Sequence, residues 1–262
     1  MEGEEKAKPR ICIVVPTYNE KENIEAFVRT TEKVLKDYGL DGHIIIVDDN
    51  SPDGTGEIAE ELAREYGNIT VIHRRGKLGL GSALKQGFKL AISKLNADVV
   101  FQMDADLSHD PRAIPDMLDV LSSGYDVVIG SRYMPGGGVI GWPPLRWFVS
   151  KGANLLGRGL LGLRFRDITN GFRVFRREAF RLLDLSEVKA DGYDFQVETL
   201  YRCASVGLKV GEVPVIFRSR TKGKSKIRLL SIASFIKTTF SLFMERLRKR
   251  RSRRSPQPIE NA

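Results

Sequence analysis

The sequence predicts an α/β protein in which a mostly parallel sheet is flanked by helices. Short apolar stretches suited to buried strands alternate with longer segments whose apolar residues recur every three or four positions. Each of the first four strand candidates is followed by a polar or glycine-rich turn and then by a helix candidate. Strands joined by helices of this length form right-handed βαβ units with parallel strands.

Amphipathic helices connect the expected strands. In the first of them Ile24, Phe27, Val28 and Val34 recur on one face, and Gly39 ends the helix. The first five strands are expected at 11–15, 43–47, 69–73, 99–103 and 126–129. Beyond residue 132 the pattern loosens, and the expected elements are a helix at 145–163, a strand at 171–176, a helix at 194–206 and a strand at 209–217.

The composition is that of an ordinary globular protein, with 42% hydrophobic and 29% charged residues. The net charge is +9, yet seven basic and no acidic residues lie between Arg246 and Arg254, and subtracting these seven leaves +2 for the rest. A basic segment without aromatic side chains has no means of stacking on bases. We therefore expect no nucleic-acid partner.

Cysteine use and apolar runs bear on where the protein works. The spacing of Cys12 and Cys203 fits neither a disulfide framework nor a zinc site, so both are expected to be buried thiols in a reducing compartment. Residues 1–9 are charged and lack the apolar core of a signal peptide. Because Lys237 interrupts the longest apolar stretch, no transmembrane helix is expected.

Two aspartates follow the fourth expected strand directly. Asp104 and Asp106 lie one residue apart at the carboxyl end of the strand, where open α/β sheets bind ligands. Neighbouring carboxylates repel each other, and a hard cation such as Mg²⁺ or Mn²⁺ relieves that repulsion. The alternative is an Asx turn in which Asp106 or Ser108 caps the next helix.

Loops 16–20, 48–55 and 104–108 are expected to converge on one edge of the sheet. Two acidic loops beside one that carries hydroxyl and amide groups indicate a site for a nucleoside at one end and a metal-bound diphosphate at the other. The glycine-rich turn at 79–84 lacks the third glycine of a dinucleotide-binding motif, and Arg218 stands where a P-loop needs glycine before Gly223.

Six motifs extend the pattern: Val-Pro-Thr-Tyr-Asn-Glu (15–20), Val-Asp-Asp-Asn-Ser-Pro-Asp-Gly-Thr (47–55), Asp-Ala-Asp-Leu-Ser-His-Asp-Pro (104–111), Gly-Ser-Arg-Tyr (130–133), Asn-Gly-Phe-Arg (170–173) and Gly-Tyr-Asp-Phe-Gln-Val-Glu (192–198). Together they resemble the large family of inverting glycosyltransferases with the GT-A fold, and within it the dolichol-phosphate mannose synthases. The resemblance covers roughly residues 10–228. It implies a GT-A fold with a Rossmann-like, mostly parallel sheet, and transfer of mannose from GDP-mannose to dolichyl or another polyprenyl phosphate.

The resemblance also implies a donor site. It implies that Pro16, Tyr18 and Glu20 line the nucleotide pocket and that Asp48 and Asp49 recognise the base or the ribose.

Asp104 and Asp106 are, by the same resemblance, the catalytic ligands of the Mg²⁺ or Mn²⁺ that bridges the donor diphosphate. Some relatives have a glutamine as a further metal ligand where this chain has Ser108. The predicted metal set is therefore Asp104, Asp106 and Ser108, with water as the alternative at the third position.

The acceptor implied by the resemblance, a lipid monophosphate, is already ionised near neutrality because its second pKa is about 6. It needs positioning more than a general base, and arginines match phosphate oxygens. Arg132 is expected to be catalytic and, with Arg146, Ser150 and Arg220, to bind the acceptor phosphate. The alternatives are a UDP-glucose-dependent polyprenyl-phosphate glucosyltransferase and a non-catalytic nucleotide-sugar-binding scaffold.

Four segments are expected: a disordered N-terminus (1–9), a GT-A catalytic domain (10–226), an amphipathic helix (227–247) and a basic disordered tail (248–262). The apolar residues of the amphipathic helix and the basic cluster after it favour a peripheral position on the cytoplasmic face of a membrane. Helix packing on the domain is the alternative. Some members of the family work with a separate membrane-embedded subunit, so the resemblance also implies such a partner here.

Overall fold

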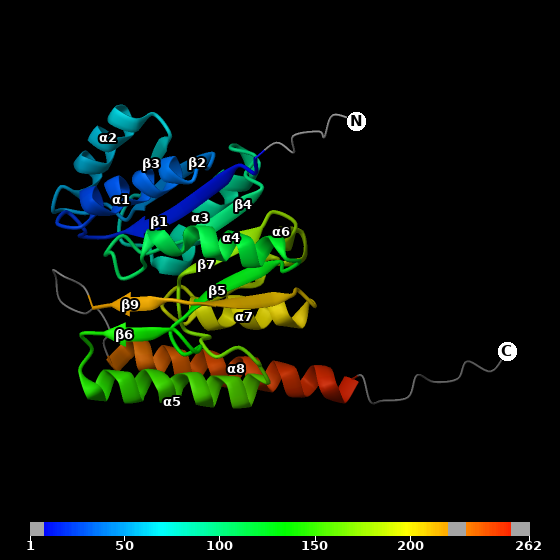
Figure 1. Ribbon diagram of the computed structural model, residues 1–262. Coiled ribbons are helices and arrows are strands. Elements are labelled where there is room, and N and C mark those ends of the chain that lie inside the picture. Colours follow the sequence, from blue (N-terminus) through cyan, green and yellow to red (C-terminus); the bar gives the residue numbers. More distant parts are fainter. Residues whose placement is uncertain (1–7, 220–228, 253–262) are drawn as a thin grey trace, which may run out of the picture.

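A seven-stranded sheet with the order β3-β2-β1-β4-β7-β5-β8 forms the centre of the computed structural model, which describes residues 8–219 and 229–252 (Figure 1). Its strands are β1 (Ile11–Thr17), β2 (Gly42–Asp48), β3 (Ile69–His73), β4 (Val99–Gln102), β5 (Val127–Ser131), β7 (Arg173–Arg176) and β8 (Val210–Pro214). Only β7 is antiparallel to its neighbours, β4 and β5. The predicted mostly parallel sheet is therefore confirmed.

Helices cover both faces of this sheet. The helices of the described residues are α1 (Ile24–Asp37), α2 (Thr55–Tyr66), α3 (Leu80–Ser93), α4 (Ile114–Ser122), α5 (Pro144–Leu161), α6 (Ala179–Leu182), α7 (Phe195–Ser205) and α8 (Leu229–Ser252), with 3-10 turns at Pro111–Ala113 and Leu185–Glu187. Helices α1, α2 and α4 pack on one face and α3, α6 and α7 on the other, as the two main hydrophobic clusters show.

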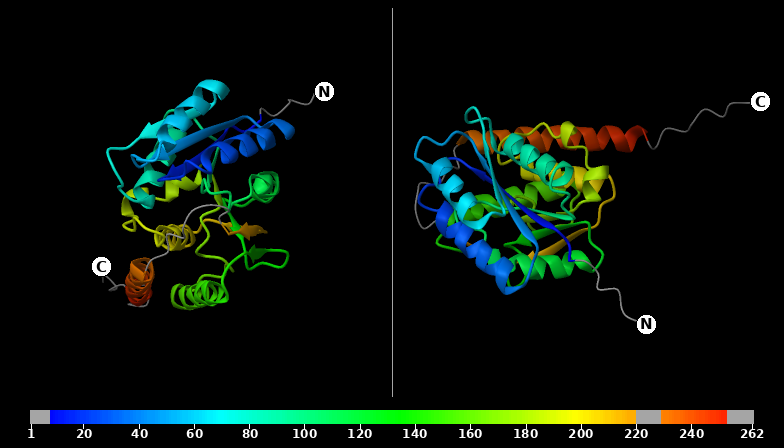
Figure 2. Two further views of the ribbon diagram at one scale, coloured as in Figure 1. Left: turned by 90° about the vertical axis from the view of Figure 1, so that its left-hand side faces the viewer. Right: turned by 90° about the horizontal axis from the view of Figure 1, so that it is seen from above.

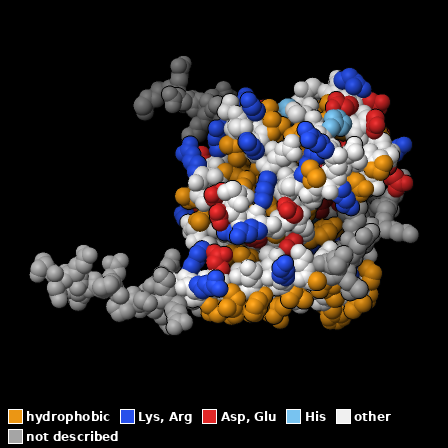
Figure 3. Space-filling model, turned by 180° about the vertical axis from the view of Figure 1, so that it is seen from behind, with side chains coloured by type: hydrophobic (Ala, Val, Ile, Leu, Met, Phe, Trp, Pro, Cys, Tyr) orange, Lys and Arg blue, Asp and Glu red, His pale blue; other side chains and the backbone are white. Residues whose placement is uncertain are grey.

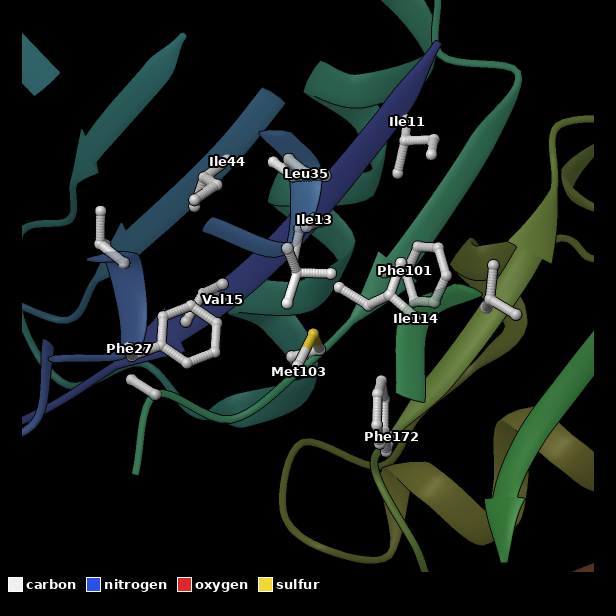
Figure 4. Packing of buried hydrophobic residues seen from close by; sticks show 14 of the residues in the cluster. Ile11, Ile13, Val15, Phe27, Leu35, Ile44, Phe101, Met103, Ile114 and Phe172 are labelled. Atoms are coloured by element: carbon white, nitrogen blue, oxygen red, sulfur yellow. The ribbon is translucent and has the colours of Figure 1, made fainter. Parts of the chain in front are cut away.

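Alternation along β1 explains how one strand serves both clusters. Ile11, Ile13 and Val15 point toward α1 and α4, whereas Cys12 and Val14 point toward α3. Figure 4 shows the first cluster, in which Ile13 and Val15 lie among side chains from β2, β4 and the helices of that face. The apolar runs that predicted buried strands are buried on both sides, as parallel sheets require.

A smaller layer lies beyond β8. Strands β6 (Gly138–Ile140) and β9 (Ile216–Arg218) pair in parallel, and α5 and α8 lie side by side next to them, seen end-on in Figure 2. The structure divides the predicted strand at 209–217 because Pro214 ends β8, and the chain then continues into the pairing with β6. Strand β6 is not among the strands expected from the sequence.

Helix α8 continues to Ser252, beyond the predicted end at residue 247. None of the helices within residues 8–219 and 229–252 is long and apolar enough to cross a bilayer. Of the segments predicted to be disordered (1–9 and 248–262), residues 1–7 and 253–262 lie outside the described residues, as does the predicted acceptor residue Arg220, whereas residues 248–252 belong to α8.

Candidate active site

The loops after β1, β2 and β4 meet at one edge of the sheet because these three strands are parallel neighbours. This is the convergence expected from the sequence. Three non-glycine residues in these loops adopt the left-handed conformation: Asn19 (φ 56°), Asn50 (φ 56°) and Leu107 (φ 59°). Asparagine tolerates it, but leucine rarely does, so backbone strain is stored beside Asp106.

Two cavities open at this edge. The first, the β1 cavity, has a volume of about 420 Å³ and lies beside the loop after β1. The second, the α5 cavity, has a volume of about 470 Å³ and lies between that edge and the first turns of α5 and α8. Four residues line both, namely Leu80, Asp104, Tyr193 and Ser231. The two cavities therefore join at the first predicted metal ligand.

The β1 cavity contains most of the predicted nucleotide-binding residues. Pro16, Tyr18, Glu20 and Asp49 all line it. Sequence reasoning missed Lys77, whose Nζ lies 4.1 Å from the centre of the Tyr18 ring. The glycine-rich turn that follows Lys77 was the available signal, because a turn of this kind lets the backbone approach a ligand.

Asp49 is held by the protein on both carboxylate oxygens. Oδ1 accepts a hydrogen bond from Nη1 of Arg74, and Oδ2 accepts from the backbone N–H groups of Leu78 (3.1 Å) and Gly79 (3.2 Å). The carboxylate thus fixes the glycine-rich turn that forms one wall of the β1 cavity. Its direct contact with a base or ribose stays a prediction.

Asp48 lies on the other side of β2. Its carboxylate accepts hydrogen bonds from Thr17 Oγ1 and from the hydroxyl and backbone N–H of Ser51, and it lines a separate groove with His73. Adjacent residues at a strand end point in opposite directions, so the structure does not bring Asp48 and Asp49 together in one cavity. A direct nucleotide contact of Asp48 stays a prediction without support from this geometry.

The two carboxylates of the Asp-Ala-Asp motif differ in their surroundings. Asp104 is one-third exposed and lines both cavities, whereas Asp106 is buried. Oδ1 of Asp106 accepts hydrogen bonds from the backbone N–H and the hydroxyl of Ser108, which is an Asx turn. The turn alternative therefore describes Asp106, although Asp110, not Asp106 or Ser108, caps the following helical turn.

His109 positions the backbone of Asp104. Its Nδ1 accepts a hydrogen bond from the Asp104 backbone N–H (3.0 Å), and its Nε2 lies 3.0 Å from Oδ1 of Asn170. Because the amide N–H can only donate, Nε2 carries the imidazole proton and donates to Asn170. The Asn170 amide donates to Gly130 O, so β4, β5 and the segment before β7 are linked beside Asp104.

The α5 cavity contains three of the four residues predicted to bind the acceptor phosphate. Arg132, Arg146 and Ser150 line it together with Asp104. Both guanidinium groups lie over the indole ring of Trp142, at 5.3 Å for Arg132 and 4.2 Å for Arg146. Sequence reasoning missed Trp142, which holds two cations close together.

Arg132 is paired with Asp167. Its Nε and Nη2 donate to the two Asp167 oxygens at 2.7 Å, its backbone N–H donates at 3.0 Å, and Nη2 also donates to Thr169 Oγ1. Both side chains are buried. Burial alone raises the pKa of Asp167, but the Arg132 charge and hydrogen bonds outweigh it and hold that pKa below its ordinary value. Among the described residues Nη1 of Arg132 has no hydrogen-bond partner, which leaves this nitrogen for a ligand.

A second buried arginine shapes the segment that carries Asp167. Arg173 is fully buried and donates to the backbone carbonyls of Ile168 (3.0 Å), Asn170 (2.9 Å) and Gln196 (2.7 Å). Burial lowers its pKa to about 10. This side chain joins the loop after α5 to the first turn of α7, and both border the α5 cavity.

The chain belongs to glycosyl transferase family 2, whose family model matches residues 12–183. It is 42% identical over 219 residues to the polyprenol monophosphomannose synthase of Mycolicibacterium smegmatis, covering 83% of this chain and 81% of that protein. It is also 40% identical over 218 residues to the undecaprenyl-phosphate mannosyltransferase of Micrococcus luteus, covering 83% and 87%.

Solved structures share the fold. One is glucosyl-3-phosphoglycerate synthase from Mycobacterium tuberculosis in complex with Mn²⁺, UDP-glucose and phosphoglyceric acid (22% identity, TM-score 0.65, 91% of this chain and 81% of that chain). Another is mannosyl-3-phosphoglycerate synthase from Rubrobacter xylanophilus (18% identity, TM-score 0.64, 97% and 79%). These likenesses confirm an α/β fold of GT-A type.

Proposed function

We propose that this glycosyltransferase transfers mannose from GDP-mannose to dolichyl or another polyprenyl phosphate, with inversion at the anomeric carbon. The names of the two relatives, at 42% and 40% identity, specify mannosylation of a polyprenyl phosphate. The observation that carries the proposal is the junction of the two cavities at Asp104. A nucleotide in the β1 cavity and a lipid phosphate in the α5 cavity would place donor and acceptor on either side of this residue.

A divalent metal fits the donor set of the proposed site. Asp104 and Asp106 offer the hard oxygen donors that Mg²⁺ and Mn²⁺ prefer. Within the described part of the chain no three His, Cys, Asp or Glu side chains gather at one point, so the donor diphosphate and water would complete the shell. A bound metal would neutralise charge on the departing diphosphate. Ser108, which donates to Asp106, would act mainly by orienting that carboxylate.

The arginines act on the nucleophile. A lipid phosphate needs no general base, so the task of the chain is to hold one of its oxygens in line with the anomeric carbon. Arg146, Nη1 of Arg132 and the Ser150 hydroxyl are the donors that the α5 cavity offers for this purpose. Asp167 and Trp142 keep the guanidinium groups in place.

Transfer of mannose to lipid tests the proposal directly. Protein supplied with GDP-mannose, Mg²⁺ and dolichyl phosphate is expected to form a chloroform-soluble mannose product. Asp104→Ala should abolish turnover with unchanged thermal unfolding, and Asp119→Ala, an exposed aspartate on α4, is the matched control. Full activity of Asp104→Ala would contradict the metal assignment. Formation of lipid-linked glucose from UDP-glucose, without any mannose product, would favour the glucosyltransferase. Absence of transfer of either sugar would favour the non-catalytic scaffold.

An apolar face beside the α5 cavity supports access from a membrane. Exposed apolar side chains gather on α5 and α8, as Figure 3 shows along one side of the molecule. They include Leu145, Phe148, Leu155 and Leu156 on α5, and Ile236, Phe240 and Met244 on α8. Leu145, Val149, Ile232 and Phe235 line the cavity itself, so a polyprenyl chain could pass from this face to the arginines without crossing polar surface.

We infer from this face that the protein lies peripherally on the cytoplasmic side of a membrane. Flotation with phosphatidylserine-containing liposomes tests it: Phe148→Gln with Phe240→Gln should reduce the floated fraction several-fold, whereas Leu182→Gln, equally exposed on α6, should not. Basic residues near an anionic surface add about 1 kcal/mol each, so high salt should also weaken binding. Equal flotation of both variants would exclude this face as the membrane-binding surface. If the unaltered protein did not float, membrane association would require a membrane-embedded partner.

A further inference from the structure

Two buried side-chain amides, one lining the α5 cavity and one beside it, carry polar atoms without hydrogen-bond partners among the described residues. Gln196, in the first turn of α7, lines the cavity, yet its side-chain Oε1 has no hydrogen-bond partner among the described residues. Gln102, the last residue of β4, lies close by, and neither its Oε1 nor its Nε2 has a partner within the described chain. Both residues are at least 98% buried. A buried polar group left unpaired destabilises the folded protein, so an unpaired buried amide calls for an explanation.

Gly171 packs between the two amides, where a larger residue would have to displace them. A Cβ added to Gly171 would lie 3.3 Å from Nε2 of Gln102, 3.3 Å from Nε2 of Gln196 and 3.6 Å from Cε1 of His109. The two amides and the imidazole therefore pack closely around Gly171. Arg173 holds the adjoining backbone, since it donates to the Gln196 carbonyl oxygen at 2.7 Å. Both amides are thus held by fixed elements of the fold.

The position of Gln196 in the same cavity as Asp104 indicates which group its amide would bind. Gln102 precedes Asp104 by two residues, and His109 accepts the Asp104 backbone N–H. Asn170 and Arg132 line the same cavity on the acceptor side. The proposed reaction moves a sugar from a diphosphate near Asp104 to a phosphate near Arg132, and Gln196 lines the cavity that contains both residues.

We propose that the Gln196 side-chain amide, with Gln102 behind it across Gly171, binds a hydroxyl group of the transferred sugar and contributes to the choice of sugar. A hydroxyl group both donates and accepts, so it satisfies an amide in either orientation. This inference rests on the proposed function and deepens it. Gln196 is a specificity-determining residue by this assignment, and Gln102 positions it.

Monodeoxy donors measure the contact directly. The full chain is assayed for kcat/KM with GDP-mannose and with its 2-, 3-, 4- and 6-deoxymannose analogues, for the unaltered protein and for Gln196→Met, which is similar in size and lacks the amide. We expect the unaltered protein to lose about 10-fold on one analogue, which is the size of a good neutral hydrogen bond. In Gln196→Met kcat/KM for GDP-mannose should be about 10-fold lower than in the unaltered protein, and replacing GDP-mannose by that analogue should lower it no further. Gln86→Met, exposed on α3, is the matched control and should leave all five values unchanged.

A second readout separates binding from structure. Gln196→Met removes an unpaired buried group, so its thermal unfolding temperature should be equal to or above that of the unaltered protein. Two results would overturn this inference and leave the proposed function intact. One is an equal loss of kcat/KM for every analogue in Gln196→Met and in the unaltered protein, and the other is a lower unfolding temperature of the variant. If the unaltered protein transferred no mannose, the proposed function would fall and this inference with it.

Discussion

Removing the charge of Asp167 should strongly destabilise the protein. Asp167→Asn keeps the size of the side chain but leaves the Arg132 guanidinium buried without a counter-ion. In the unaltered protein three Arg132 N–H groups reach Asp167 at 2.7–3.0 Å, and Asp167 is fully buried. Breaking a buried pair of this kind by removing one partner costs about 3–5 kcal/mol. At 4 kcal/mol the unfolding equilibrium shifts by about a thousandfold.

The sign of the pH dependence provides an internal check. In the unaltered protein the pKa of Asp167 is lowered, so its contribution to stability is present above the pKa of the unfolded chain and is lost only as pH falls through the lower folded value. Stability from this group is therefore constant between pH 7 and 5. In Arg132→Met the carboxyl loses its cation, and burial then raises its pKa. That variant should regain part of its lost stability as pH falls from 7 to 5, because protonation discharges the buried group.

Guanidinium chloride unfolding followed by far-UV circular dichroism measures both effects. The double variant Arg132→Met with Asp167→Leu removes both charges and should lie close to the unaltered protein in stability, since apolar replacement of a buried pair is often neutral. The reasoning would be refuted by an Asp167→Asn unfolding free energy within about 1 kcal/mol of the unaltered value, against the 3–5 kcal/mol expected.

Two further predictions concern the core. Burial raises the pKa of Cys12 and of Cys203 to about 12. A thiol reagent at pH 8 should therefore modify neither cysteine in the folded protein and both after unfolding. Rapid reaction of one thiol in the folded protein would contradict this prediction. A Cβ on Gly87 would overlap Val14, so Gly87→Ala should lower the free energy of unfolding by about 1–3 kcal/mol. Gly152 on α5 has open space around it, so Gly152→Ala should raise the free energy of unfolding by about 0.5–1 kcal/mol. Thermal unfolding that ranked the two variants the other way would be inconsistent with the packing.

The sheet and the edge at which its polar loops converge could be predicted from the sequence because both depend on local pattern. Apolar runs identify parallel strands, and Asp104 follows one of them directly. The period-two alternation of a strand would also have separated Asp48 from Asp49, since neighbouring residues face opposite ways. The family resemblance instead predicted one shared role in nucleotide binding for both aspartates.

Partners distant in the sequence could not be predicted. Asp167 lies 35 residues from Arg132, and no spacing rule links an arginine after β5 to a carboxylate after α5. The pairing of β6 with β9 also joins short segments far apart in the chain, and each is too short to show a periodicity. The unpaired amides of Gln102 and Gln196 are visible only once the tertiary structure shows what surrounds them.

Helix α8 has a consequence for the order in which the site is completed during synthesis of the chain. Ser231 lines both cavities and Ser234 lines the β1 cavity, and the hydroxyls of Ser234 and Thr238 donate to Asp194 at the start of α7. Every other described wall is translated earlier. A chain still emerging from the ribosome therefore has an open site until α8 docks, so it gains its last wall together with the helix that carries part of the apolar face.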